Sequence, residues 1–145
     1  MSPFSARVSA EILADFPEWQ AASRFERYKG SDEYFVVELA PPNQTSLPLR
    51  ISTWDDEITV DLDYYHAHFE RWRPAPGDTR YLAGLLFVTD VLNDRLGAAS
   101  WWQGDHCKMC SPYEPGGALT PRFNISFSRV RVRSWTGLLD VDDEV

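Results

Sequence analysis

The three histidines and both cysteines of this 145-residue chain fall in two short segments. The first is Tyr-His-Ala-His-Phe at 65–69, which contains His66 and His68, and the second is His-Cys-Lys-Met-Cys at 106–110. Imidazole and thiol side chains bind transition metals, and they act as bases or nucleophiles near neutral pH. Any site that uses imidazole or thiol chemistry must therefore draw on these two segments.

One interpretation joins both segments in a zinc site. Zinc in proteins prefers four tetrahedral nitrogen and sulfur ligands. The chain offers one such set, with His106 to spare: His66, His68, Cys107 and Cys110. The competing interpretation makes the cysteines small packing residues and the histidines hydrogen-bonded residues at a sheet edge. A single CxxC spacing does not decide between the two.

The same residues would be needed for nucleophilic or redox catalysis, but their sequence context is unfavourable. Neither Cys107 nor Cys110 stands in a recognisable nucleophile motif. A redox CxxC precedes a helix in a thioredoxin-like unit, whereas Ser-Pro-Tyr-Glu-Pro-Gly-Gly follows Cys110 here. We therefore expect a protein that is not an enzyme.

Five carboxylates crowd one short region of the chain: Asp55, Asp56, Glu57, Asp61 and Asp63. As catalytic groups they would form a general acid–base pair or a magnesium site. The simpler interpretation is a turn followed by a solvated strand face, with Asp61 and Asp63 opposite one of three arginines, Arg129, Arg131 or Arg133. An acidic patch is also suited to docking against a basic protein surface.

Composition restricts the class of protein. The formal net charge of −8 disfavours binding to nucleic acid or to anionic lipid. No apolar stretch reaches the length of a membrane span and no secretory signal is visible, so a cytoplasmic location is expected. The chain carries six Trp, six Tyr and eight Phe, which is ample material for one core without disulfides.

The elements that position these residues follow from hydrophobic periodicity. Apolar residues recur at helical spacing in the first thirty positions, which predicts N-terminal helical segments interrupted at Pro17. A helix is expected at 79–96, with Asp78 as its N-cap and Gly97 as its C-terminal cap. Strands are expected at 33–40, 47–54, 57–65, 98–103 and 122–135.

These elements predict an α+β fold in one domain, 1–145. The 79–96 helix would cover an antiparallel curved sheet of about five strands, and residues 140–145 would form a frayed tail. Residues 106–110 are expected in an irregular loop. The apolar positions change parity within 122–135, which predicts a bulge or break near Ser128–Arg129.

The local pattern also makes expectations about single side chains. If the strand at 57–65 continues without interruption, His66 and His68 extend its buried row; if the chain turns helical there, the two rings diverge. Trp101 and Trp102 should point to opposite faces of their strand, so that at least one is buried. Trp102 and Tyr113 are candidates for an exposed protein-binding surface.

The run Ile51-Ser-Thr-Trp-Asp-Asp-Glu-Ile-Thr-Val-Asp-Leu-Asp-Tyr-Tyr-His-Ala-His-Phe resembles a segment of one group of bacterial proteins. Small proteins that accompany polymorphic toxins as immunity proteins carry the pattern T-x-x-x-E-[VI]-T-V followed by Y-H-x-H-F. The resemblance covers about twenty residues of the chain. It implies a compact, acidic, cytoplasmic protein that binds and blocks a cognate toxin domain.

The leading hypothesis is therefore a non-enzymatic toxin inhibitor without a cofactor. Its expected contact residues are Asp55, Asp56, Glu57, Asp61, Asp63, Trp102 and Tyr113. One alternative is a zinc-binding protein or metal-dependent enzyme that uses the His66/His68 and Cys107/Cys110 pairs. Another is a small ligand-binding module with a pocket between the 81–96 helix and the sheet. Self-association into a homodimer is left open by the sequence.

Overall fold

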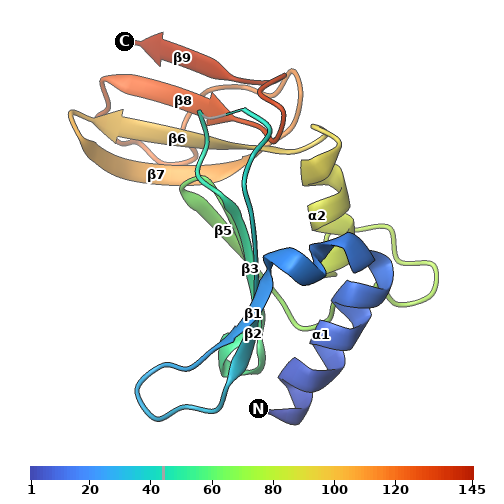
Figure 1. Cartoon of the computed structure of the whole chain (residues 1–145). Helices are drawn as coiled ribbons and strands as arrows, with labels where there is room; N and C mark the ends of the chain where they lie inside the picture. Colours follow the sequence, from blue (N-terminus) through green and yellow to red (C-terminus); the bar gives the residue numbers. More distant parts are fainter. Residues whose placement is uncertain (44) are drawn as a thin grey trace. The chain divides into compact units, whose positions relative to one another are not determined.

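The computed structural model describes residues 1–43 and 45–145 (Figure 1). Gln44 falls in the expected connection between the first two strands and lies outside the described residues. The described chain divides into two compact units. The first comprises Met1–Ala40, Pro48–Asp61 and His66–Thr89, and the second comprises Pro41–Leu47, Leu62–Tyr65 and Asp90–Val145.

The first unit begins with helix α1 (Pro3–Asp15) and the short 3-10 helix η1 (Pro17–Ala22). The Ser2 hydroxyl caps α1 by accepting a hydrogen bond from the Ser5 amide at 3.1 Å. Pro17 cannot continue an α-helix, and the predicted interruption at this residue is confirmed. Helical structure ends sooner than expected, since residues 23–26 form a strand.

Among the described residues, five antiparallel strands form the first sheet, in the order β1-β2-β3-β4-β5. The strands are β1 (Ser23–Glu26), β2 (Tyr34–Leu39), β3 (Leu49–Ser52), β4 (Ile58–Leu62) and β5 (Tyr65–Phe69). Alternation on β4 follows the prediction, because Ile58 and Val60 are buried while Thr59 and Asp61 are partly exposed. Helix α1 packs against β2 and buries Val8 and Ile12.

The strand predicted at 57–65 ends early, and this changes the placement of the two histidines. β4 ends at Leu62, and the chain reverses at Asp63, whose φ is 51°. β5 then presents Ala67 and Phe69 to the core, while His66 and His68 are exposed. The expectation that the histidines extend a buried row was wrong, because a two-residue turn changes which parity of residue faces inward.

Helix α2 (Gly84–Leu92) starts later than the predicted 79–96 helix. Its first amide groups donate to loop carbonyls, with Gly84 N–H to Arg71 O at 3.0 Å and Leu85 N–H to Trp72 O at 2.9 Å. Asp78 is therefore not its N-cap, and its carboxylate instead accepts from the Arg80 amide at 3.1 Å. Backbone carbonyls have replaced the side-chain cap that the sequence suggested.

The other end and the buried side of α2 also differ from the prediction. Asp94, with φ of 51°, takes the left-handed position after the helix, and Gly97 begins a strand. The buried residues of α2 include Phe87, Val88 and Val91. Tyr81 and Leu82 fall within the predicted 79–96 helix, but they precede α2 and are exposed.

Within the described part of the second unit, four strands form an antiparallel sheet in the order β7-β6-β8-β9. They are β6 (Gly97–Gln103), β7 (His106–Tyr113), β8 (Arg129–Arg133) and β9 (Val141–Glu144). One face of this sheet builds the core of the unit from Ala99, Trp101, Val130 and Val132. The predicted α+β class with antiparallel strands is confirmed, although the strands are divided between two sheets instead of one.

The segment 106–110 is not the loop that the sequence suggested. It belongs to β7 and pairs with β6, with Cys107 opposite Trp102 and Met109 opposite Trp101. Lys108 is therefore the extra residue of a β-bulge. Because of the bulge, Cys107 and Cys110 share a face of the strand despite their odd spacing.

β8 begins at Arg129, where the sequence predicted an interruption, but residues 122–128 form no strand, so that part of the strand predicted at 122–135 was wrong. The tail is not frayed: β9 pairs with β8. The Arg133 guanidinium, on β8, binds the Asp142 carboxylate of β9 at 3.0 Å. The acidic composition of the tail suggested a frayed end, but β8 and Arg133 hold it in the sheet.

A substitution at Gly84 would test the packing around Trp72, the largest fully buried side chain among the described residues. A Cβ at position 84 would lie 2.9 Å from Trp72 Cε3, a steric overlap. We expect Gly84→Ala to destabilise the fold by about 1–3 kcal/mol, the usual cost of overpacking. Urea denaturation would measure it. Stabilisation, which Gly to Ala ordinarily produces in a helix, would contradict the packing argument.

Candidate functional site

The acidic residues predicted to make a partner surface fall into three environments. Asp55, Asp56 and Glu57 are exposed between β3 and β4. Asp61 lies opposite Arg50 of β3, and burial raises the pKa of its carboxyl group. Asp63 is buried, with a side chain only 1% exposed. Only the first group is therefore fully open to a partner.

The exposed group stands on a strained turn. Asp55 and Asp56 have φ of 59° and 53°, and the Glu57 amide donates to the Trp54 carbonyl at 3.3 Å. Two successive central residues with positive φ define a type I′ turn, in which Asn-Gly is the favoured pair. Here both central positions are aspartate, which is less favourable than glycine in the left-handed conformation. The turn therefore places two negative charges at the tip of the hairpin.

A pocket of about 190 Å³ lies beside this turn, entirely within the first unit. It is lined by Ser2, Ser5, Ser31, Asp32, Glu33, Tyr34, Thr53, Trp54, Asp55 and Asp56. Asp32 and Glu33 come from the connection between β1 and β2. In an antiparallel sheet this connection lies at the same end as the turn between β3 and β4, which explains why four carboxylates meet here.

Helix α1 supports the floor of the pocket. The Ser2 hydroxyl donates to Asp56 Oδ1 at 2.7 Å, and this fixes one carboxylate by the start of the helix. The Thr53 hydroxyl donates to Ser5 Oγ at 2.7 Å and accepts from the Phe35 amide at 2.9 Å. These contacts connect α1, β2 and the end of β3, so the pocket is positioned by three elements of the first unit.

Two exposed aromatic rings border the acidic pocket. Trp54 and Tyr28 are 49% and 53% exposed, and their ring centroids lie 5.8 Å apart in an edge-to-face arrangement. Large exposed aromatic rings are typical of protein-binding hot spots. We call Tyr28, Asp32, Glu33, Trp54, Asp55 and Asp56 the acidic–aromatic site.

The acidic–aromatic site is suited to hold a cation. None of the described residues that line the pocket is basic. Two basic groups lie beside the site: Arg27 pairs with Glu33 in an exposed contact at 3.7 Å, and Lys29 Nζ lies 5.5 Å from the centroid of the Tyr28 ring. Carboxylates and a tryptophan face both attract an ammonium or guanidinium group. The geometry therefore fits a basic side chain of another protein better than an anionic or apolar ligand.

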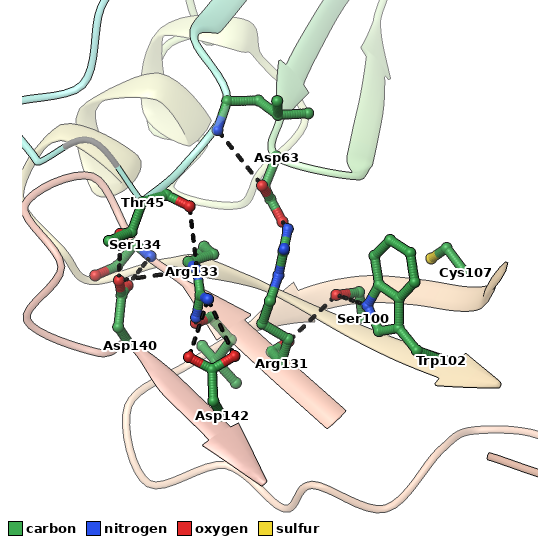
Figure 2. Close-up of polar contacts among 12 residues, drawn as sticks. Thr45, Asp63, Ser100, Trp102, Cys107, Arg131, Arg133, Ser134, Asp140 and Asp142 are labelled. Atoms are coloured by element: carbon green, nitrogen blue, oxygen red, sulfur yellow. Dashed lines mark hydrogen bonds and ion pairs between the residues drawn. The ribbon is translucent and has the colours of Figure 1, made fainter. Parts of the chain in front are cut away.

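The contact residues expected in the second unit are placed differently. The Asp63 carboxylate accepts a hydrogen bond from Arg131 Nη2 at 2.6 Å; both side chains are drawn in Figure 2. The Arg131 guanidinium lies over the rings of Tyr64 and Trp102, with 5.1 and 5.4 Å to the ring centroids. Arg131 was one of three predicted partners for Asp63. This pairing makes Asp63 a structural residue of the second unit.

Trp102 and Tyr113 are not open contact residues either. Trp102 is 6% exposed, and its indole N–H donates to Ser100 Oγ at 2.8 Å. Trp101 is buried in the core cluster on the opposite face, as alternation predicted. Tyr113 is half-buried against the same cluster. Both tryptophans are thus packing residues.

The cysteines are half-buried thiols, and none of the residues that the structure describes places an activating group at hydrogen-bond distance from them. Burial raises the pKa of both Cys107 and Cys110. The Cys107 thiol makes a long hydrogen bond to the Met109 carbonyl at 3.5 Å. A reactive cysteine requires the opposite shift, so this environment does not activate a nucleophile.

The four-ligand zinc interpretation gains no geometric support. Across residues 1–43 and 45–145, no group of three or more His, Cys, Asp or Glu side chains is placed to hold a metal ion. His66 and His68 belong to the first unit, and Cys107 and Cys110 to the second.

Another hollow, of about 530 Å³, opens beside the end of β5 and the segment that precedes α2. Its lining mixes Glu70 and Asp78 with Arg71 and Arg80, so its charge favours no single class of ligand.

None of the helices in the described part of the chain is long and apolar enough to cross a membrane.

No protein-family model, curated protein or solved structure matches this chain. Its function must therefore be argued from the site.

Sequence reasoning missed Tyr28, Asp32, Glu33 and Trp54 as parts of one site. Residues 23–26 were expected to be helical, and without β1 there was no hairpin to bring its tip beside the turn at 54–57. The usable signal was the turn at Lys29–Asp32 followed by a strand, which is typical of a hairpin.

The Asp63–Arg131 pair supports a stability prediction. We expect Asp63→Asn to cost about 2 kcal/mol or more, because it leaves a largely buried guanidinium without its counter-charge. Asparagine tolerates positive φ, so backbone strain does not account for the loss. In urea denaturation, the double variant Asp63→Asn, Arg131→Met should recover part of the stability. A change below about 0.5 kcal/mol in the single variant would contradict a structural role.

Thiol chemistry gives a separate prediction. At about pH 7.5, iodoacetamide should alkylate Cys107 and Cys110 more slowly than free cysteine, because burial raises their pKa and lowers the thiolate fraction. The rate should rise as the pH increases, and urea should remove the difference. Mass spectrometry of the labelled protein measures both effects. Faster labelling than free cysteine would show an activated thiol.

Proposed function

We propose that this protein is an immunity-type protein that binds and neutralises a cognate bacterial toxin domain without catalysis. The observation that carries the proposal is the meeting of four carboxylates and two exposed aromatic rings in the acidic–aromatic site. The resemblance of Ile51–Phe69 to toxin-associated immunity proteins supports the same assignment.

Electrostatics favour a basic partner surface. The chain carries a net charge of −8, which accelerates encounter with a cationic protein and slows encounter with an anionic one. Many toxin domains act on nucleic acid and need a basic surface to do so. An acidic protein that covers such a surface would block access of the substrate.

The aromatic pair supplies the contact area that charge alone lacks. Trp54 and Tyr28 are held by hairpin tips instead of flexible tails, so little conformational entropy is lost when a partner covers them. Charge would then set the association rate, and the rings would slow dissociation.

The test is binding to the product of the adjacent gene, measured by biolayer interferometry. The variant Asp55→Asn, Asp56→Gly keeps the type I′ turn, because Asn-Gly is its preferred pair, and removes two charges. We expect the affinity to fall at least tenfold, mainly through slower association, and to depend less on salt. Trp54→Ala should weaken binding about thirtyfold through faster dissociation.

A matched control removes two charges elsewhere. Asp143 and Glu144 are exposed on β9 in the second unit, so Asp143→Asn, Glu144→Gln changes the net charge equally. We expect its affinity to stay within about twofold of wild type. Equal losses in the turn variant and the control would reduce the effect to net charge. A neighbouring product that is not toxin-like and does not bind the wild-type protein would remove the proposed function.

A further inference from the structure

The outward face of β4 and β5 carries an arrangement that the proposed function does not use. His66 and His68 are both exposed on one face of β5, and their ring centroids lie 5.1 Å apart. Side chains at i and i+2 on a strand stand about 6.6 Å apart at the backbone. Exposed imidazoles at this spacing can reorient to place one nitrogen each on a common ion.

A carboxylate already orients one of the two rings. Glu57 Oε1 lies 2.5 Å from His68 Nδ1, and the Thr59 hydroxyl lies 3.3 Å from the same nitrogen. An ionised carboxylate only accepts hydrogen bonds, so Nδ1 carries the proton and the lone pair of His68 is on Nε2. Metal-binding histidines in proteins show this carboxylate–imidazole contact, because it fixes the tautomer and raises the basicity of the ligand nitrogen.

The charge around the two rings also favours a cation. Glu57 and Asp61 lie on β4 or at its start, and Asp61 interacts electrostatically with both histidines. Arg50 of β3 lies nearby, and its guanidinium is held by Glu26 at 2.8 Å. His68 also lines the hollow that contains Arg71 and Arg80, where Arg80 pairs with Asp78 at 3.2 Å and Glu70 is a further carboxylate. The positive charges around His68 are therefore matched by carboxylates.

We propose that His66 and His68 chelate one divalent transition-metal ion of the imidazole-preferring class, Cu²⁺, Ni²⁺ or Zn²⁺. His68 binds through Nε2, Glu57 orients its ring, and His66 supplies the second nitrogen. Because the described residues hold no group of three ligands, this is an open site with two protein ligands. Water or a ligand from another molecule fills the other coordination positions.

The test is isothermal titration of the untagged full chain with NiCl₂, and then with ZnCl₂. We expect one ion per chain, and at least tenfold weaker binding in His66→Ala and in His68→Ala. Glu57→Gln should weaken binding about tenfold while both imidazoles remain, as loss of an orienting carboxylate does. Affinity should fall from about pH 7.5 to about pH 5.5, because protonated imidazoles do not bind metal.

Controls separate this site from other metal-binding groups. His106→Ala removes the remaining histidine, which is exposed on β7, and should leave the affinity unchanged. The double variant Cys107→Ser, Cys110→Ser should also bind as wild type. Circular dichroism and the urea midpoint verify that each variant folds. Wild-type affinity in the folded His66→Ala or His68→Ala variant, or loss of binding in either control, would overturn the proposal.

Discussion

A β-strand presents successive side chains to opposite faces, and the placement of the histidine pair and the cysteine pair depends on where that alternation is interrupted. The turn at Asp63 changes the inward parity between β4 and β5, so Ala67 enters the core and His68 faces solvent. The bulge at Lys108 makes the same kind of change in β7, where it places both cysteines on one face. The first interruption thus exposes the histidine pair, and the second places the half-buried cysteine pair on one face.

Burial then divides residues that look equivalent in the sequence. Asp55 and Asp63 are both acidic residues with positive φ in turns beside β4. Asp55 remains exposed and contributes charge to the acidic–aromatic site, whereas Asp63 is buried in an ion pair with Arg131 in the second unit. A buried carboxylate destabilises the fold unless it is paired with a positive charge, and a carboxylate paired in this way cannot also contact a partner protein. The acidic surface is therefore smaller than the acidic composition suggests.

The two proposals in the first unit use opposite physical properties of neighbouring residues. The acidic–aromatic site relies on a fixed backbone, because the type I′ turn and the Ser2–Asp56 hydrogen bond hold its charges in place. The His66/His68 pair relies on exposed side chains that can rotate around a shared ion, with Glu57 limiting the rotation of one ring. Glu57 follows the turn directly, so the two sites adjoin in sequence while using different chemistry.

Local patterns in the sequence determined the α+β class, the helix break at Pro17, the alternation of β4 and the break before Arg129, because each rests on neighbouring residues. Tertiary structure decided what depends on distant pairing. The acidic tail forms β9 because it pairs with the edge of β8 and because Arg133 binds the carboxylate of Asp142. The acidic–aromatic site formed because β1, read as helix from its spacing, pairs with β2 and brings Asp32 to the end of the sheet where Asp55 lies. The spacing of residues along the chain does not show which strand edges pair. The pairing of β1 with β2 is therefore what determines where the site forms.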